Sequence, residues 1–197
     1  MELRVRNNLA SLMVLDGGKS ASARFEVLVR AHYRALYRTA LRLTRSVHDA
    51  EDLVQEVCVR AFPRLEEIEG LERPHFWLVR VMYRVFIDSR RRYERRNVES
   101  IETHSEPFTE EAGPAEEIDV LLMRERLDRA WRRLDDHQRA LLALHDIEGY
   151  TLAELNEMMG IKEGTLKSRL HRARVRLGKL LEREQHVDAT KVIGAIG

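Results

Sequence analysis

The chain has 197 residues, and its 34 Lys and Arg residues nearly cancel its 33 Asp and Glu residues, giving a formal net charge of +1. This length fits one or two domains and excludes three, and no apolar run approaches the ~20 residues that cross a bilayer. The single cysteine, Cys58, excludes an intrachain disulfide framework and favours a reducing compartment, most simply the cytoplasm.

Helices are expected throughout, because the chain has only 10 Gly and 4 Pro residues and no long strand-like alternation. Three- and four-residue apolar spacing predicts a first helix across Phe25–Leu41. A second helix is expected to start at Ser46 and to end or kink at Pro63. A third begins near Pro74, which is tolerated in a first helical turn, and ends in the basic run Arg90–Arg96.

Helical periodicity stops between Asn97 and Asp119. This segment holds eight acidic residues, two prolines and no Lys or Arg. Low hydrophobicity with high net charge leaves too little apolar area to offset the entropy of ordering, so we expect a linker.

Helical spacing resumes across Ile118–Leu134. Capping residues at Asp135 and Thr151 predict the starts of two more helices, the second of which should stop at Gly160. The last long helix is expected over Glu163–Glu184, where leucines recur at intervals of three and four.

The expected fold class is therefore all-α, with two small helical domains joined by a flexible acidic linker and a helix-turn-helix in the C-terminal domain. We expect an N-terminal arm at 1–22, a first domain at 23–96, the linker at 97–118, a second domain at 119–183 and a C-terminal tail at 184–197. Each domain is long enough for one modest core.

The near-zero net charge is a cancellation between segregated blocks. Arg73–Arg96 and Lys162–Arg183 each carry eight basic and two acidic residues, a local charge of +6, whereas Asp49–Glu69 carries −5 and Asn97–Asp119 carries −8. Two basic helices in two domains indicate two contacts with a polyanion. The alternative is two solvated faces with i,i+4 ion pairing, but these helices contain few acids for such pairing.

Residues 151–171 show a helix-turn-helix pattern, in which a short capped helix and a Gly-containing turn precede a basic second helix. Ala153 is expected where the two helices approach, and Gly160 permits the tight turn. Leu166 and Leu170 would hold the second helix to the core. An ordinary helical hairpin is the alternative, but the basic second helix favours DNA. The residues left for a major groove and its phosphates are Thr165, Lys167, Ser168, Arg169, His171 and Arg172.

Five of the twelve aromatic residues fall within the third helix, interleaved with arginines: Phe76, Trp77, Tyr83, Phe86 and Tyr93. Stacking rings beside arginines suit unpaired bases and their phosphates. Core packing is the alternative, which is expected for Phe86 and stays open for Trp77 and Tyr83. Duplex binding in one domain and unpaired-strand binding in the other indicate a protein that opens DNA at a start site.

The acidic stretch Asp49–Glu56 admits two interpretations. Its carboxylates lie on adjacent helical turns near His48, but no second cluster faces them and hard-ion sites usually add loop oxygens, so a metal site is not favoured. The preferred hypothesis is a protein-docking surface beside Leu53, formed by Asp52, Gln55 and Glu56. The chain shows no metal-ligand spacing of His residues, no Gly-rich phosphate loop and no nucleophile elbow, so we expect neither an enzyme nor a cofactor.

Two stretches of the chain, in order, resemble a known family. The first, Phe25–Arg92, includes Asp49-Ala-Glu-Asp-Leu-Val-Gln-Glu56 and Phe76-Trp-Leu78, and the second, Leu134–Leu181, includes Gly164-Thr-Leu-Lys-Ser-Arg-Leu-His-Arg-Ala-Arg174. They resemble the second and fourth conserved regions of bacterial RNA polymerase sigma factors of the small, extracytoplasmic-function (ECF) type in the sigma-70 family. A linker stands in place of the third-region helices.

The resemblance implies roles for individual residues. The helix that grips the clamp helices of the largest polymerase subunit would carry Asp49, Glu51, Asp52, Leu53, Gln55 and Glu56. The −10 promoter element would be melted and read by Phe76, Trp77, Arg80, Tyr83, Arg84, Arg91 and Arg92. The −35 promoter element would be read by Thr165, Lys167, Ser168, Arg169, His171, Arg172 and Arg174.

The resemblance also implies partners. They are core RNA polymerase, including the flap of its second-largest subunit, promoter DNA and an anti-sigma protein that is often membrane-bound, with no membrane insertion by this chain. The acidic linker would thread toward the active-site and RNA-exit channels of the polymerase.

Three residues depart from the family pattern. Arg84 stands where the family often has Asn, Asn156 where the short helix often has Ala, and Pro63 in place of a usual helix former. Two other function classes stay open: a stand-alone helix-turn-helix regulator that binds DNA without polymerase, and a sigma-like decoy for an anti-sigma protein. The two +6 helices argue against the decoy.

Overall fold

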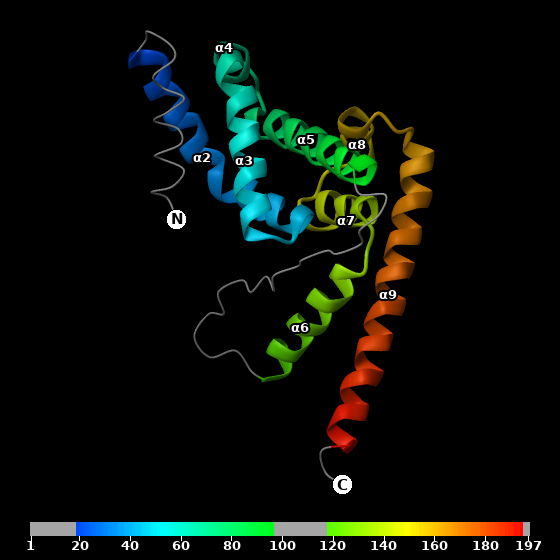
Figure 1. Cartoon of the computed structure of the whole chain (residues 1–197). Coiled ribbons are helices and arrows are strands. Elements are labelled where there is room, and N and C mark those ends of the chain that lie inside the picture. The colour runs from blue at the N-terminus through cyan, green and yellow to red at the C-terminus, as the bar shows by residue number, and fades with distance from the viewer. Residues whose placement is uncertain (1–18, 97–117, 195–197) are drawn as a thin grey trace. The chain divides into compact units, whose positions relative to one another are not determined.

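The computed structural model describes residues 19–96 and 118–194, with side chains described over 21–95 and 120–185. Within these ranges every regular element is a helix (Figure 1), which confirms the all-α fold. The described residues fall into two compact units, which lie within Met1–Glu106 and Pro107–Gly197. The expected linker lies outside the described residues except for Ile118, where α6 begins.

The N-terminal unit is built on three long helices with a short turn of helix between the second and third. In chain order its elements are α2 (Lys19–Thr44), α3 (Val47–Ala61), the 3-10 turn η2 (Phe62–Arg64), α4 (Leu65–Glu69) and α5 (Pro74–Arg96). The first helix begins at Lys19, inside the expected N-terminal arm, and residues 1–18 lie outside the described part of the chain.

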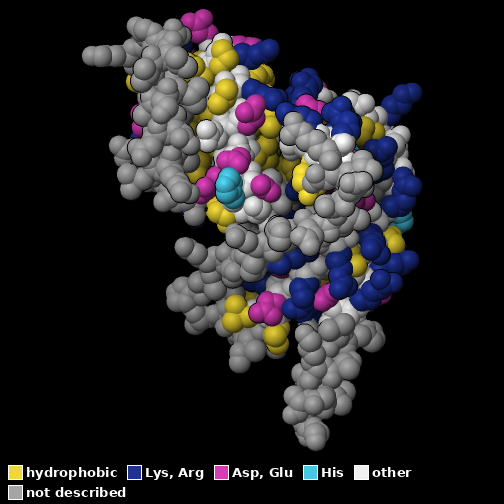
Figure 2. All heavy atoms as spheres, viewed as in Figure 1, with side chains coloured by type: hydrophobic (Ala, Val, Ile, Leu, Met, Phe, Trp, Pro, Cys, Tyr) yellow, Lys and Arg dark blue, Asp and Glu magenta, His cyan; other side chains and the backbone are white. Residues whose placement is uncertain are grey.

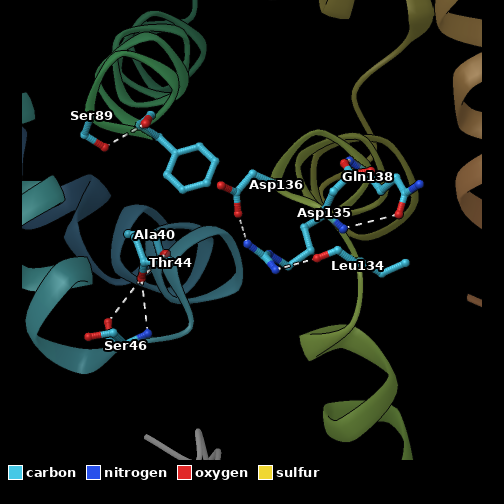
Figure 3. Close-up of polar contacts among 10 residues, drawn as sticks. Ala40, Thr44, Ser46, Ser89, Leu134, Asp135, Asp136 and Gln138 are labelled. Carbon is cyan, nitrogen blue, oxygen red and sulfur yellow. Dashed lines mark hydrogen bonds and ion pairs between the residues drawn. The ribbon is translucent and has the colours of Figure 1, made fainter. Parts of the chain in front are cut away.

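The turn between α2 and α3 is closed by hydrogen bonds that the local sequence supplies. Arg45 takes a left-handed conformation, with φ of 61°, and ends α2. Figure 3 shows Thr44 reaching both Ala40 and Ser46: its Oγ1 donates to the carbonyl of Ala40 at 2.9 Å. The Ser46 side chain then accepts from the Asp49 backbone N–H at 3.1 Å, which caps α3 as predicted.

Helix α3 lies at the centre of the N-terminal unit, because it packs against both α2 and α5. It ends at Ala61, and Pro63 sits in the 3-10 turn that follows, as the sequence predicted. That turn places Phe62 edge-on to Phe25 of α2, with ring centroids 5.1 Å apart. Cys58 faces this core, and burial raises the pKa of its thiol to about 11, so the thiol stays protonated and unreactive at neutral pH.

The C-terminal unit is assembled around one long helix. Its elements are α6 (Ile118–Arg132), α7 (Asp136–Leu142), the π-helical turn η3 (Ala143–Ile147), α8 (Leu152–Met159) and α9 (Glu163–Gly194). Helix α9 packs against α6, α7 and α8, and Leu166, Leu170, Ala173 and Leu180 along one side of it are buried.

Both predicted capping boxes are present. In α7 the Asp135 side chain accepts from the Gln138 backbone N–H at 2.8 Å, and the Gln138 side chain returns the contact (Figure 3). Thr151 and Glu154 make the same reciprocal pair at the start of α8. Gly160 ends α8 with φ of 69°, a left-handed conformation that favours glycine. The four residues satisfy helix-end N–H groups that would otherwise lack partners.

Two buried charges fix the helices of this unit, and the sequence pattern pointed to neither. Arg139 is buried, donates to the Leu134 carbonyl at 2.8 Å and is ion-paired to Asp136; Figure 3 labels these two partners. A charge this deep is tolerated only when it is paired and hydrogen-bonded, so this cluster holds the start of α7 in one arrangement.

Glu184 is the second buried charge, with 3% of the residue exposed. Its carboxylate accepts from Arg129 Nε at 2.7 Å and lies 3.1 Å from Arg133 Nη1, which ties α9 to the end of α6. We expected the last helix to end near Glu184 and a tail to follow, but α9 continues to Gly194. Glu184 is therefore part of the packed C-terminal unit.

We predict that Glu184→Gln destabilises the C-terminal unit by about 1–3 kcal/mol, because the variant replaces charge-assisted hydrogen bonds with weaker ones at a buried site. The measurement is urea unfolding followed by Trp131 fluorescence in a Trp77→Phe background. Glu125→Gln is the matched control, since Glu125 also pairs with Arg129, at 3.6 Å, but is exposed. Equal changes in the two variants would contradict a structural role for the buried carboxylate.

Candidate functional site

Helices α8 and α9 form a helix-turn-helix. Leu155 and Met158 of α8 and Leu166 and Leu170 of α9 are buried, so the two helices share a core on their inner sides. The left-handed Gly160 makes the chain turn tightly between them. The outer side of the first turns of α9 is therefore left to solvent, which is the side that a helix-turn-helix presents to a major groove.

The close approach of α8 and α9 involves a different residue from the one we expected. Ala153 is exposed, so it does not lie where the helices meet. Asn156 is partly buried instead, and its Nδ2 donates to the Ile161 carbonyl at 2.8 Å. The amide thus satisfies a backbone acceptor just past the turn. The departure from the family's usual Ala is compensated by a hydrogen bond that Ala cannot make.

Most of the predicted duplex-binding residues are exposed on the first turns of α9. The first turns of α9 carry a set of exposed polar and basic side chains: Thr165, Lys167, Ser168, Arg169, His171 and Arg172. At 3.6 residues per turn, Thr165, Ser168, Arg169 and Arg172 share one face of the helix. No hydrogen bond or ion pair within the described ranges occupies the side chains of Arg169 or Arg172, so both remain available for bases or phosphates.

Arg174 differs from the other predicted duplex-binding residues because its side chain is ion-paired within the C-terminal unit. Its guanidinium is ion-paired to Asp146 in η3, with Nε 2.9 Å from Oδ2. Hydrogen bonds from Arg174, and to a lesser extent its charge, hold the pKa of Asp146 below its usual value despite the opposing effect of partial burial. Arg174 therefore braces α9 against η3 through an ion pair at the surface, and a contact between Arg174 and DNA stays a prediction.

The Arg174–Asp146 ion pair leads to a prediction of how the stability of the protein depends on pH. A carboxyl group whose pKa is lowered by folding stabilises the protein fully above its unfolded pKa, ~3.9, and that contribution is lost as the pH falls through the folded value. We expect Asp146→Asn to cost under about 1 kcal/mol at pH 7, because the pair is partly exposed. The difference between wild type and variant should shrink toward pH 3 in urea unfolding monitored by Trp131. A difference that widens on acidification would contradict the assignment.

The acidic face of α3 is largely available to a partner. Asp49, Asp52 and Gln55 are exposed on the side opposite the core. Asp52 lies 3.2 Å from His48 Nδ1, and Glu56 accepts from Arg60 at 2.9 Å. These contacts link exposed groups one helical turn apart and hold the side chains only weakly, so a partner can replace them.

Two members of the predicted docking set are less available. Leu53 is only 6% exposed and packs in the core, so it supports the face from behind. Glu51 is partly buried beside Tyr37 of α2, whose pKa is raised by burial and, secondarily, by the negative charge of Glu51. The side chains best placed for docking are therefore Asp49, Asp52, Gln55 and Glu56.

The aromatic and basic side chains of α5 divide between core and surface. Tyr83 is 6% exposed and Phe86 is 1% exposed, so Phe86 packs as expected, and the open choice for Tyr83 is settled in favour of the core. Trp77 is half-buried. Helical spacing places it on one face with Arg80, Arg84 and Arg91.

Two arginines of the N-terminal unit cover aromatic rings. The Arg73 guanidinium lies 5.3 Å from the ring centroid of Phe76, at the start of α5, and that of Arg90 lies 5.6 Å from Phe86. Arg73 lies just before α5 and was not among the predicted site residues, and its position three residues before Phe76 was the available signal. Arg92 uses its Nε to hydrogen-bond the Asp88 carbonyl at 3.2 Å, one turn back on the same helix.

No group of three or more His, Cys, Asp or Glu side chains in the described ranges is arranged to hold a metal ion. Among the described helices, none has the length and apolar character needed to cross a membrane.

Two family models match the chain: Sigma-70 region 2 over residues 28–96 and Sigma-70, region 4 over residues 124–177. The ECF RNA polymerase sigma factor SigL of Mycobacterium tuberculosis is 36% identical over 161 residues, which covers 81% of this chain and 90% of SigL. The ECF RNA polymerase sigma factor SigE of Mycolicibacterium smegmatis is 34% identical over 164 residues, which covers 82% of this chain and 63% of SigE.

Solved structures show the same fold. The sigma factor RpoE of Bartonella quintana, in complex with the anti-sigma factor NepR, matches with a TM-score of 0.63 and 25% identity over 80% of this chain and 96% of RpoE. CnrH, in complex with the cytosolic domain of CnrY, matches with a TM-score of 0.55 and 22% identity over 91% of this chain and 95% of CnrH.

Proposed function

Because the chain belongs to the ECF sigma factors of bacterial RNA polymerase, we propose that it binds core polymerase and directs it to promoters, which it recognises and melts. The observation that carries this proposal is that one chain holds both a Sigma-70 region 2 unit, in which α3 has an exposed acidic face, and a Sigma-70, region 4 unit, in which α9 has an exposed basic face. The protein would act in the cytoplasm as a specificity subunit without enzymatic activity.

In this function each unit has its own task. Helix α3 docks on the clamp helices of the largest polymerase subunit, and the face of α5 that carries Trp77, Arg80 and Arg84 meets the −10 element. The first turns of α9 read the −35 element. Tyr83 contributes from the core of the N-terminal unit by fixing the position of α5, and Leu53 does the same for α3.

An anti-sigma protein is a further expected partner. The similar structure of RpoE was solved in complex with the anti-sigma factor NepR, and that of CnrH in complex with the cytosolic domain of CnrY. An anti-sigma protein that covers α3 or α9 would compete directly with polymerase or DNA for the same charged side chains.

A stand-alone DNA-binding regulator is not favoured, because the region 2 unit and its acidic α3 face would then have no partner. The two classes differ in a mobility-shift measurement. A sigma factor is expected to bind promoter DNA specifically when core polymerase is present, whereas a stand-alone regulator binds with the same affinity and specificity without it.

We predict that the double variant Asp52→Ala/Glu56→Ala weakens binding to core polymerase about tenfold or more, because it removes two exposed charges from the docking face. Affinity would be measured by titrating labelled full-length chain with core enzyme. Glu66→Ala/Glu67→Ala is the matched control: it makes the same charge change on α4 of the same unit, at exposed positions away from the docking face. Equal affinities for the two double variants would contradict docking through α3.

We predict that Arg169→Ala weakens holoenzyme binding by about 1–3 kcal/mol at promoters with an intact −35 element, because it removes an exposed base or phosphate contact. Footprinting should show the loss of protection concentrated at that element. Arg34→Ala, at an exposed position on α2, is the control and should leave the footprint unchanged. A normal footprint at the −35 element in the Arg169 variant would exclude the assignment.

A further inference from the structure

The DNA-facing side of α9 continues well beyond the helix-turn-helix. From Arg172, basic residues recur at intervals of four, three and four residues: Arg176, Lys179 and Arg183, which we call the α9 stripe. With ~100° of rotation per residue, the stripe stays on the same side of the helix as Thr165, Arg169 and Arg172. With a rise of ~1.5 Å per residue, it extends the basic face by ~16 Å past Arg172.

All three side chains of the α9 stripe are exposed, and none makes a hydrogen bond or ion pair with any described residue. Neighbouring charged residues differ from the stripe because they are paired. Arg174 is ion-paired to Asp146, and the buried carboxylate of Glu184 is ion-paired to Arg129 and Arg133. Figure 2 shows Lys and Arg side chains gathered along α9. Like charges at i,i+4 repel, so this spacing weakly disfavours the helix and is not explained by pairing within the described unit.

The helix that carries the α9 stripe is held rigidly as far as the stripe runs. Leu180 is 1% exposed on the buried side of α9, which adjoins the stripe, and the ion pairs of Glu184 attach the same level of the helix to α6. The cations are therefore presented from a packed element in a fixed line. Such a line suits a ligand whose negative charges are themselves regularly spaced.

We propose that the α9 stripe binds backbone phosphates of duplex DNA flanking the −35 element and adds sequence-independent affinity to the holoenzyme–promoter complex. This rests on the proposed function. Duplex DNA is favoured over an acidic protein because the stripe shares the recognition face, so with Arg169 and Arg172 in a major groove the stripe faces the phosphate backbone at the edge of that groove. Lys179 and Arg183 lie past residue 177, where the Sigma-70, region 4 match ends.

The test is salt-dependent binding of full-length holoenzyme to a promoter that the wild-type enzyme protects in footprints. For the triple variant Arg176→Gln/Lys179→Gln/Arg183→Gln we expect the log–log salt dependence to become less steep by about 3, at ~0.9 per phosphate contact. Affinity should fall about 10- to 100-fold near 0.15 M salt. The ratio of affinities for intact and scrambled −35 elements should stay the same, because phosphate contacts carry no sequence information.

The matched control is Arg30→Gln/Arg34→Gln/Arg38→Gln, which makes the same charge change at exposed positions of α2 and should leave the salt dependence at the wild-type value. A stripe variant with wild-type salt dependence would overturn the proposal, as would loss of −35 discrimination in that variant. If the wild-type holoenzyme protects no promoter, the proposed function fails and this proposal fails with it. Wild-type protection with an unaltered slope for the stripe variant removes this proposal alone.

Discussion

The apolar seam along α9 is the constraint on which the C-terminal unit depends. Leu166, Leu170, Ala173 and Leu180 are all buried, and their spacing of four, three and seven residues keeps them on one side of a rigid helix. Once this side is packed against α6, α7 and α8, helix geometry decides which residues face outward. The outward orientation of Arg169 and Arg172 is therefore a consequence of core packing, because no loop has to position these side chains.

The same division between a buried seam and a charged face explains the near-zero net charge. The exposed side of α3 is acidic, and the exposed side of α9 is basic. Charges on these two faces make few contacts with the rest of their own unit, whereas Asp146, Glu184 and Arg139 elsewhere are paired and structural. A chain that must bind both a polymerase and the DNA that the polymerase reads needs surfaces of both signs, and their sum is near zero.

Sequence reasoning succeeded where structure is decided locally. Ser46, Asp135 and Thr151 cap helices as predicted, because a capping side chain reaches only the backbone two or three residues ahead. The break at Pro63 and the left-handed turn at Gly160 are likewise properties of single residues.

Predictions from the sequence failed where a contact joins distant parts of the chain. The Arg174–Asp146 pair is 28 residues apart in sequence and the Arg129–Glu184 pair is 55 apart, and neither has a local pattern. The burial of Tyr83 and Leu53 depends on how α3 and α5 pack, and both residues also fit an exposed functional role. Ala153 and Asn156 show the same limit at short range, since only packing determines which of them meets the turn.

The central claim is that this chain gives core RNA polymerase its promoter specificity. The most direct measurement is transcription in vitro with purified core enzyme and a genomic template, with transcript ends mapped in the presence and absence of the full-length chain. The account predicts transcripts that start at defined positions only when the chain is present, with a shared sequence element upstream of those starts. An identical set of starts with and without the chain would contradict it.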